Sequence, residues 1–270
     1  MRSAIYLYNN LHNGDQLFTR PLVRRLADSE RFDIVVGAFR NTAYLYEDLV
    51  TPHCRLHVSE YDDIGYWAMF DLAVECPAGH APIDTWLGAY PDTHAHQWHN
   101  VVEVANRQLA ERGIAFRIEP GEVPMIDFAP RPLAPRLRGK AVYVENGPTR
   151  SAHSTFTFDL AEMAGRHPEL CFVCTAPPGV PADNVVDASR YDLRDLSGLS
   201  EQCLAILGKG SGPFCCTYTT ANRSKPRAVC GYRSATSPTF WDYRGSPIRH
   251  LDSMSEVLEF LAEHAEAPAR

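Results

Sequence analysis

Short apolar segments alternate with amphipathic segments along the chain, and this alternation limits the fold more than any other feature. In the first half, apolar runs suited to strands lie at residues 4–8, 31–37 and 55–58, and residues 70–75 form a fourth strand or an extended piece. Apolar residues recur at helical spacing after the first run, which would place Pro21 in the first turn of a helix. Strands that alternate with helices predict a mostly parallel sheet covered on both faces.

The second half of the chain repeats the alternation. We expect strands at residues 141–144, 171–175, 184–186, 205–207 and 229–232, and helices at residues 159–166, 196–204 and 254–265. Further helices are expected in the first half at residues 41–50 and 98–112, the second ending at Gly113. Between the halves, residues 119–138 are rich in proline and poor in periodic apolar residues. We therefore predict two α/β domains, residues 1–125 and 136–270, joined by a linker at residues 120–135.

Composition excludes several functional classes. The net charge is −7 and no cluster of lysine or arginine reverses it, which argues against a nucleic-acid binder. No apolar run approaches the length of a membrane span, and the first residues lead directly into a strand without a signal peptide. The eight cysteines lie mostly in apolar segments, which is typical of buried, reduced thiols in a cytoplasmic protein. Cys171 and Cys174 resemble a redox or zinc pair, but residues three apart on a strand face opposite ways, so core packing is favoured.

One glycine-rich stretch stands out as a candidate binding loop. Three glycines alternate with other residues in Gly208-Lys209-Gly210-Ser211-Gly212-Pro213, directly after the apolar run at residues 205–207. Glycine permits sharp turns and close approach of the backbone to a ligand, and a helix opening after Pro213 would direct free amides at an anion such as a pyrophosphate. The spacing fits neither a Walker loop nor the dinucleotide fingerprint, and a plain turn remains the alternative.

Histidines form a second cluster that could bind a ligand. His94, His96 and His99 could hold zinc, but their spacing matches no familiar motif and no acidic partner is evident. Solvated or hydrogen-bonding histidines are therefore favoured, and we expect no metal site.

The short motifs together resemble heptosyltransferase-like, family 9-like glycosyltransferases of the GT-B class. In the second half the resemblance rests on Glu145-Asn146-Gly147-Pro148 with residues 151–154, on residues 167–175, on Asp192-Leu193-Arg194-Asp195-Leu196, and on the glycine stretch. In the first half it rests on Gly14-Asp15 followed by Thr19-Arg20-Pro21-Leu22. The resemblance implies two Rossmann-like domains that face each other across a cleft. It also implies a nucleotide-sugar donor and a hydroxyl acceptor as partners, and no cofactor.

The resemblance also assigns candidate site residues. On the donor side they are Lys209, Gly210, Ser211, Gly212, Asn146, Ser151, His153 and Ser154. On the acceptor side they are Asn13, Gly14, Asp84 and Trp86. Turn polar groups such as Asn146 often serve only their own backbone, so a purely structural role stays open for them.

The chemistry of sugar transfer requires a base for the acceptor hydroxyl and positive charge or amide dipoles for the departing diphosphate. Asp15 follows the first strand, where open α/β sheets place ligands, and is the candidate base; an N-cap role is the alternative and does not exclude it. The sequence has no Asp-x-Asp motif, which predicts a metal-independent reaction using loop amides with Lys209, Arg150 or Lys225 as cations.

Two other functions remain open at this point. A catalytically inactive GT-B-like protein would keep the ligand site without turnover. Another nucleotide-using α/β enzyme, such as an epimerase or a hydrolase, would use the same loop differently. A serine hydrolase is disfavoured because no Gly-x-Ser-x-Gly motif is present.

Overall fold

A computed structural model of the chain describes residues 2–63, 70–90, 92, 97–129, 137, 140–148, 154–231, 241–242 and 248–265, with residues 97–99 described for their backbone alone. The chain divides into two compact units. The first comprises Met1–Asp127 with Asp242–Arg244, and the second comprises Phe128–Trp241 with Gly245–Arg270. Each unit has its own parallel sheet, so the expectation of an α/β fold built from two Rossmann-like parts is confirmed.

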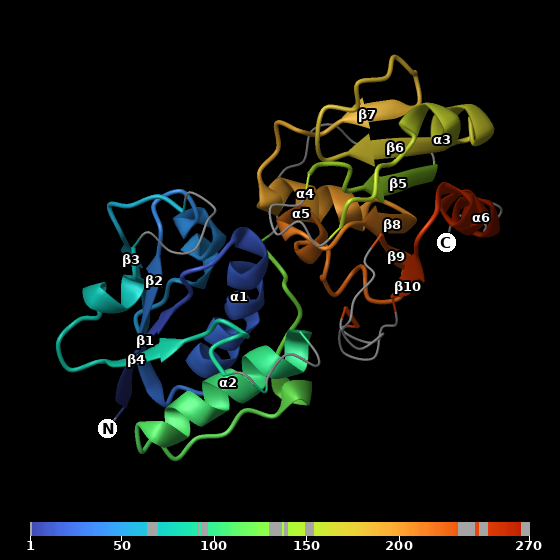
Figure 1. The fold of residues 1–270 in the computed structure, drawn as a ribbon. Coiled ribbons are helices and arrows are strands. Elements are labelled where there is room, and N and C mark those ends of the chain that lie inside the picture. The colour runs from blue at the N-terminus through green and yellow to red at the C-terminus, as the bar shows by residue number, and fades with distance from the viewer. Residues whose placement is uncertain are drawn as a thin grey trace. The chain divides into compact units, whose positions relative to one another are not determined.

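The first unit is built on a sheet of four described strands in the order β3-β2-β1-β4. They are β1 (Ser3–Tyr8), β2 (Phe32–Ala38), β3 (Cys54–Val58) and β4 (Ala81–Asp84), and all pair in parallel. Helix α1 (Asn13–Asp28) packs on β2, and helix α2 (Gln97–Glu111) packs on β4 and against α1 (Figure 1). Strand β2 is almost wholly buried and the middle of β1 is buried, as expected of a parallel sheet covered by helices.

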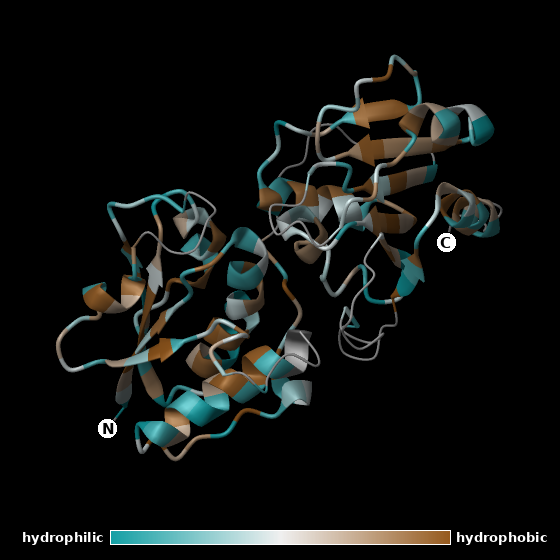
Figure 2. Cartoon of the chain, viewed as in Figure 1, coloured by the Kyte–Doolittle hydropathy of each residue, from teal (hydrophilic) through white to brown (hydrophobic). Residues whose placement is uncertain are grey.

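The second unit holds a sheet of six described strands in the order β10-β9-β8-β5-β6-β7, again with every pairing parallel. The strands are β5 (Lys140–Val144), β6 (Leu170–Cys174), β7 (Val185–Asp187), β8 (Ala205–Gly208), β9 (Arg227–Cys230) and β10 (Arg249–Leu251). Helices α3 (Leu160–Arg166) and α6 (Met254–Ala265) cover one face, and their apolar side chains join alternate strand residues in one core. Helices α4 (Leu193–Glu201) and α5 (Gly212–Cys215) contact β5 and β8. Figure 2 shows β6 and β7 in the hydrophobic colour, whereas the edge strand β10 is largely hydrophilic.

Two expectations for the first unit are wrong. Residues 41–50 form two 3₁₀ turns, η1 (Ala43–Leu45) and η2 (Glu47–Leu49), in place of one helix, and the carbonyl of Leu45 accepts from the buried Arg20 guanidinium. Residues 72–75 form the 3₁₀ turn η3 (Leu72–Glu75), and the fourth strand is instead β4. Strand β4 contains Pro82, and it lies at the edge of the sheet, where a missing N–H is tolerated.

The beginning of α1 also differs from expectation. The helix starts at Asn13, which places Pro21 in its interior and not in its first turn. Proline costs one helix hydrogen bond there, and burial of Leu17, Leu22 and Leu26 against the sheet compensates for it. In the second unit, β10 went unrecognised because its three residues include only one that is fully buried.

Part of the proline-rich stretch is built into the first unit. Val123 and Ile126 are fully buried, and a 3₁₀ turn, η4 (Pro120–Glu122), is closed by reciprocal capping between Glu119 and Glu122. Residues 130–136, where the predicted linker ends, lie outside the described residues.

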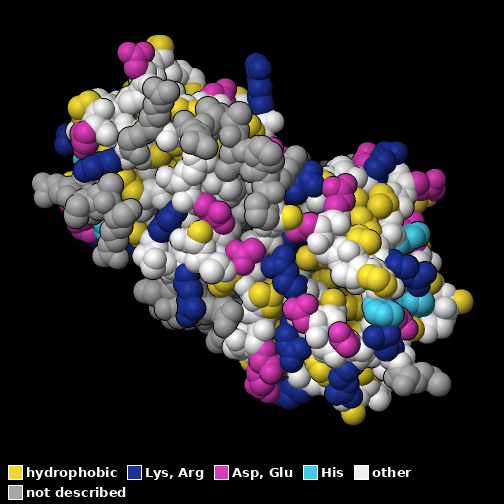
Figure 3. All heavy atoms as spheres, turned by 180° about the vertical axis from the view of Figure 1, so that it is seen from behind, with side chains coloured by type: hydrophobic (Ala, Val, Ile, Leu, Met, Phe, Trp, Pro, Cys, Tyr) yellow, Lys and Arg dark blue, Asp and Glu magenta, His cyan; other side chains and the backbone are white. Residues whose placement is uncertain are grey.

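All eight cysteines lie in the described part of the chain and are free thiols, six of them buried. Cys174 points into the core of the second unit, and burial raises its pKa to about 12. The interpretation of Cys171 and Cys174 as strand residues and not as a redox or zinc pair agrees with their position on β6. Among the described helices, none is long and apolar enough to span a membrane. Figure 3 shows basic and acidic side chains interspersed over the face it presents.

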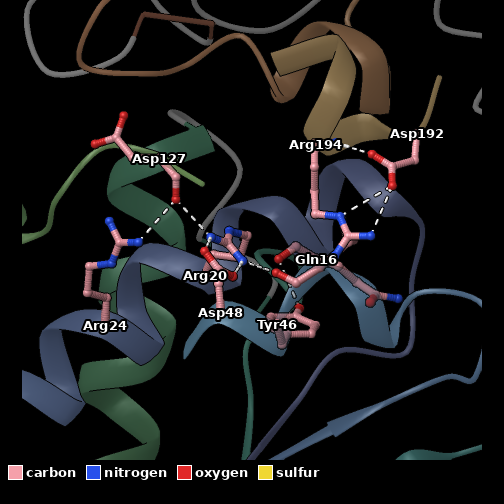
Figure 4. A network of polar contacts seen from close by, with 9 residues as sticks. Gln16, Arg20, Arg24, Tyr46, Asp48, Asp127, Asp192 and Arg194 are labelled. Atoms are coloured by element: carbon pink, nitrogen blue, oxygen red, sulfur yellow. Dashed lines mark hydrogen bonds and ion pairs between the residues drawn. The ribbon is translucent and has the colours of Figure 1, made fainter. Parts of the chain in front are cut away.

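A buried ion pair ties α1 to the rest of the first unit (Figure 4). The Arg20 guanidinium is 2% exposed and donates to both carboxylate oxygens of Asp48, at 2.7 and 2.9 Å. It also donates to the carbonyls of Leu45 and Asp127, the second of which is shared with Arg24. One side chain therefore links the helix, the turn between η1 and η2, and the end of the unit.

Replacing Arg20 by methionine should destabilise the first unit by about 3 kcal/mol, because the Asp48 carboxylate and the Leu45 carbonyl lose the Arg20 donor in a buried position. The double variant Arg20→Met with Asp48→Leu should recover part of that loss, since no uncompensated charge remains. Urea denaturation followed by circular dichroism measures both. Arg40→Met, which breaks an exposed pair with Asp62, is the control and should have little effect. A single variant as stable as the wild type would contradict the importance of this pair.

Candidate active site

Each sheet contains one point where the strand order reverses direction. In the first unit β1 lies between β2 and β4, and in the second unit β5 lies between β6 and β8. The loops that leave the two neighbouring strands at such a point diverge and leave a crevice at the carboxyl ends, which is where open α/β sheets bind ligands. In the first unit these loops carry Asp15 and Asp84. In the second unit they carry Glu145 and the glycine stretch.

Asp15 lies in the first turn of α1, just beyond the end of β1. The N-cap of the helix is His12, so Asp15 is not the cap residue, although its charge still suits the positive end of the helix. Burial raises the pKa of the Asp15 carboxyl to about 6, and the nearby Asp63 and Asp84 act in the same direction, whereas His12 and the backbone N–H of Asp15 oppose them. A carboxyl with this pKa can exchange a proton near neutral pH.

Asp84 ends β4 and is the second acidic group at this point of the sheet. Burial raises its pKa to about 6, against a hydrogen bond from the backbone N–H of Trp86 to its Oδ1 at 2.9 Å. Its own backbone is held by Gln108 of α2, whose amide donates to the Asp84 carbonyl and accepts from the Asp84 N–H, each at 2.8 Å. These hydrogen bonds fix the position of Asp84, which lies at the same edge of the sheet as Asp15.

A buried network of hydroxyls supports the loops after β1 and β4. The Thr19 and Thr85 hydroxyls are 2.7 Å apart, and Thr85 also donates to the carbonyl of Tyr8 at the end of β1. Asn9 accepts from the backbone N–H of Leu11 and so shapes the turn into α1. Asn13 and Gly14, predicted on the acceptor side, form the first two positions of that helix beside Asp15. The four acceptor-side candidates therefore gather at one end of the first sheet.

In the second unit the glycine stretch is held by a residue that sequence reasoning had not singled out. Glu145 follows β5 and is 1% exposed. Its Oε2 accepts from the backbone N–H of Lys209 at 2.6 Å, and its Oε1 accepts from the Ser211 hydroxyl. The sequence did contain a signal for this role: Glu145 is an acidic residue directly after β5, the strand that pairs with β8. From the sequence alone we considered it only as part of the Glu145-Asn146-Gly147-Pro148 motif.

The loop itself has the geometry that its glycines predicted. Gly210 has a φ of +78°, and a Cβ there would approach the Trp241 ring to 2.4 Å, so both backbone conformation and space require glycine. Helix α5 follows, as predicted from Pro213, but it has only four residues and Ser211 as N-cap. Because α5 is so short, we expect the backbone amides of the loop, and not a helix dipole, to interact with a ligand.

Other donor-side candidates have structural tasks. Both polar atoms of the Asn146 amide bind the backbone of Ala176, which joins the loops after β5 and β6. The Ser154 hydroxyl donates to the carbonyl of Cys230 at 2.8 Å. Lys209 is 5% exposed; its ammonium is 3.5 Å from the Asn146 carbonyl, and burial lowers its pKa. Lys209 thus supplies a cation within the glycine loop itself.

Lys225 is not available to a diphosphate, contrary to expectation. Its ammonium donates to the carbonyls of Ser200 and Glu201 and so caps the end of α4, at the edge of the sheet where the strands begin. Ser151, His153, Arg150, His94 and His96 lie outside the described residues, as does the side chain of His99.

The raised pKa of Asp15 allows us to predict how Asp15→Asn changes the stability of the protein at different pH values. The pKa of the Asp15 carboxyl is about 6 in the folded protein and near 3.8 in the unfolded chain. Ionisation of Asp15 therefore lowers the free energy of unfolding as the pH rises from about 4 to 6, and the full loss is present above pH 6. Asp15→Asn should therefore stabilise the protein by about 1–2 kcal/mol at pH 8 and leave it unchanged at pH 4. Thermal unfolding at both pH values measures this, with the exposed Asp28→Asn on the same helix as control. A loss of stability at pH 8 would contradict the environment described for Asp15.

Comparison with known proteins supports the fold. No protein-family model and no curated protein sequence matches the chain. Among solved structures, a family 9 glycosyl transferase from Veillonella parvula matches with a TM-score of 0.58 and 10% identity over 99% of this chain and 90% of that one. The E. coli heptosyltransferase WaaC with ADP matches with a TM-score of 0.55 and 13% identity over 98% and 100%. E. coli ADP-heptose lps heptosyltransferase II matches with 0.53 and 15%, over 98% of each chain. The chain therefore has the fold of GT-B type, family 9-like glycosyltransferases.

Proposed function

We propose that the protein is a glycosyltransferase that moves a sugar from a nucleotide-activated donor to a hydroxyl group of an acceptor, without a metal ion. The observation that carries the proposal is the Asp15 carboxyl, partly buried at the reversal point of the first sheet with its pKa raised to about 6. The likeness of the fold to glycosyltransferases supports the reaction class.

In the proposed reaction Asp15 is the general base. As the acceptor oxygen attacks the anomeric carbon of the donor, its proton passes to the Asp15 carboxylate. The bond between that carbon and the diphosphate oxygen breaks, and its electron pair leaves with the diphosphate. A base whose pKa is close to the working pH is both deprotonated and basic enough for this transfer. Asp84 supplies a second carboxyl that can accept hydrogen bonds from other hydroxyls of the acceptor.

We assign binding of the donor and of its departing diphosphate to the second unit. The loop at residues 209–212 offers backbone N–H groups and the Ser211 hydroxyl, and Lys209 offers a cation to the departing diphosphate. One of the comparison structures contains ADP, and another is a heptosyltransferase for ADP-heptose. We therefore take ADP-sugars as the first donors to test.

A second candidate function is ligand binding without turnover. This candidate and the first differ in whether a bound donor is consumed.

The test is donor consumption by wild type and by Asp15→Asn. Wild-type protein incubated with ADP-, UDP-, GDP- and dTDP-sugars and a mixture of sugar acceptors should release one nucleoside diphosphate, measured by chromatography. Asp15→Asn keeps the shape but not the basicity, so turnover should fall by about 10²–10⁴-fold with donor affinity nearly unchanged. In the wild type, kcat/KM should fall about tenfold per pH unit below about 6, as Asp15 becomes protonated. Donor binding without any release of diphosphate would favour the binding protein, and unchanged turnover in Asp15→Asn would remove Asp15 as the base.

Metal independence has its own test. If side chains and loop amides alone stabilise the diphosphate, activity after dialysis against EDTA should remain within about twofold of the untreated protein. Manganese and magnesium are then added back to the dialysed enzyme. Loss of activity on dialysis, restored by either ion, would contradict the metal-independent proposal.

A further inference from the structure

The Glu145 carboxylate already makes the contacts on the glycine loop that a phosphate would make. One oxygen accepts from the Lys209 N–H at 2.6 Å and the other from the Ser211 hydroxyl. A carboxylate and a phosphate are both acceptors of hydrogen bonds, so they compete for the same donors. Without a bound ligand, the glycine loop therefore already binds an anionic group, the Glu145 carboxylate of the same chain.

The surroundings of Glu145 offer one opposite charge. The groups that interact with the Glu145 carboxyl are Lys209 and Ser211 of the loop, the Tyr143 phenol of β5, the Cys216 thiol after α5 and the Cys230 thiol of β9. Burial raises the pKa of the phenol and of both thiols, so all three are neutral at pH 7. Among the causes that act on the Glu145 carboxyl, the opposite charge is that of Lys209. Burial raises the pKa of Glu145 itself, against the hydrogen bonds and the charge of Lys209.

A diphosphate that approaches this loop meets a buried negative charge. Two anions that share a site disfavour each other's ionised form, as with paired carboxylates. Protonation of Glu145 removes the repulsion and also provides an O–H group that can donate to a phosphate oxygen. The Lys209 amide, the Ser211 hydroxyl and the Lys209 ammonium then become available to the diphosphate.

We propose that Glu145 is an internal anion that holds the glycine loop in the free protein and takes up a proton when the diphosphate of the donor binds. This inference rests on the donor site proposed above. It makes Glu145 a positioning residue and predicts that donor affinity falls as pH rises, because a larger fraction of free protein carries the charged carboxylate.

The test is the affinity of Glu145→Gln for whichever of ADP, GDP, UDP and dTDP the wild type binds most tightly. Glutamine keeps the size and an acceptor oxygen for the Lys209 N–H but carries no charge. By calorimetry the variant should bind at least about tenfold more tightly than wild type at pH 8, and the difference should shrink towards pH 6. Glu201→Gln, an exposed change of the same charge in the same unit, should bind as wild type does.

Proton uptake gives a second readout. Calorimetry in two buffers of different ionisation enthalpy counts the protons bound with the nucleotide, and the Glu145→Gln value accounts for the titration of the phosphate itself. Wild type should take up more protons than the variant between pH 7 and 8. If Glu145→Gln does not fold, Ser211→Ala replaces it: losing a donor to the carboxylate should move the fall in affinity to higher pH.

The outcomes separate the two proposals. Nucleotide binding by wild type, with equal or weaker binding by Glu145→Gln and no excess proton uptake, overturns the role of Glu145 and leaves the donor site standing. An unmoved pH dependence in Ser211→Ala has the same meaning. Binding of none of the four nucleotides by wild type or by variant, in folded protein across the pH range, overturns both.

Discussion

The parallel pairing of the strands is the constraint on which the rest of the structure depends. Every pairing between the named strands of both sheets is parallel, so the strands of each sheet end at a common edge. Parallel strands need crossover connections, and the helices in these connections bury both faces. The order of strands then reverses once in each sheet, beside β1 and beside β5. Both groups of candidate residues lie on the loops at these two points, for the same topological reason.

The two units handle buried charge in different ways. At the reversal point of the first sheet, Asp15 and Asp84 have raised pKa values, and both are poised to exchange protons near neutral pH. At the corresponding point of the second sheet, Glu145 is compensated by an amide, a hydroxyl and the neighbouring Lys209. The first arrangement suits a base, and the second holds the glycine loop through hydrogen bonds to the Glu145 carboxylate. The buried Arg20 and the Asp48 carboxylate form a third arrangement, an ion pair joined by two hydrogen bonds.

The likeness to family 9-like glycosyltransferases extends over nearly the whole chain at 10–15% identity. At that level few side chains are shared, and the common property is the placement of apolar strands and helices. A fold can persist in this way because a core requires hydrophobic residues of suitable size at the right positions more than particular ones. The chemistry must then be argued from the residues that this chain places at its own reversal points.

Local pattern in the sequence was enough for most of the fold. The apolar runs of β1, β2, β5, β6 and β8, the amphipathic repeat of α2 and α6, and the glycine loop before α5 follow from side-chain periodicity and backbone freedom, which act over a few residues. The same reasoning placed Asp15 and the loop at strand ends. It also anticipated buried cysteines, since most of them lie in apolar segments, and six of the eight are buried.

Tertiary contacts decided what local pattern could not. Residues 41–50 form two short turns in place of a helix, and Arg20, more than twenty residues away, donates to the Leu45 carbonyl. Pro82 became part of a strand because β4 lies at an edge, which depends on the strand order. Lys225 was drawn to the end of α4, and Glu145, 64 residues before Lys209, became the partner of the loop. The sequence by itself determined most of the strands and helices and where polar loops follow them. Only the folded chain determined which charged groups meet, because hydrogen bonds and desolvation depend on neighbours that are distant in sequence.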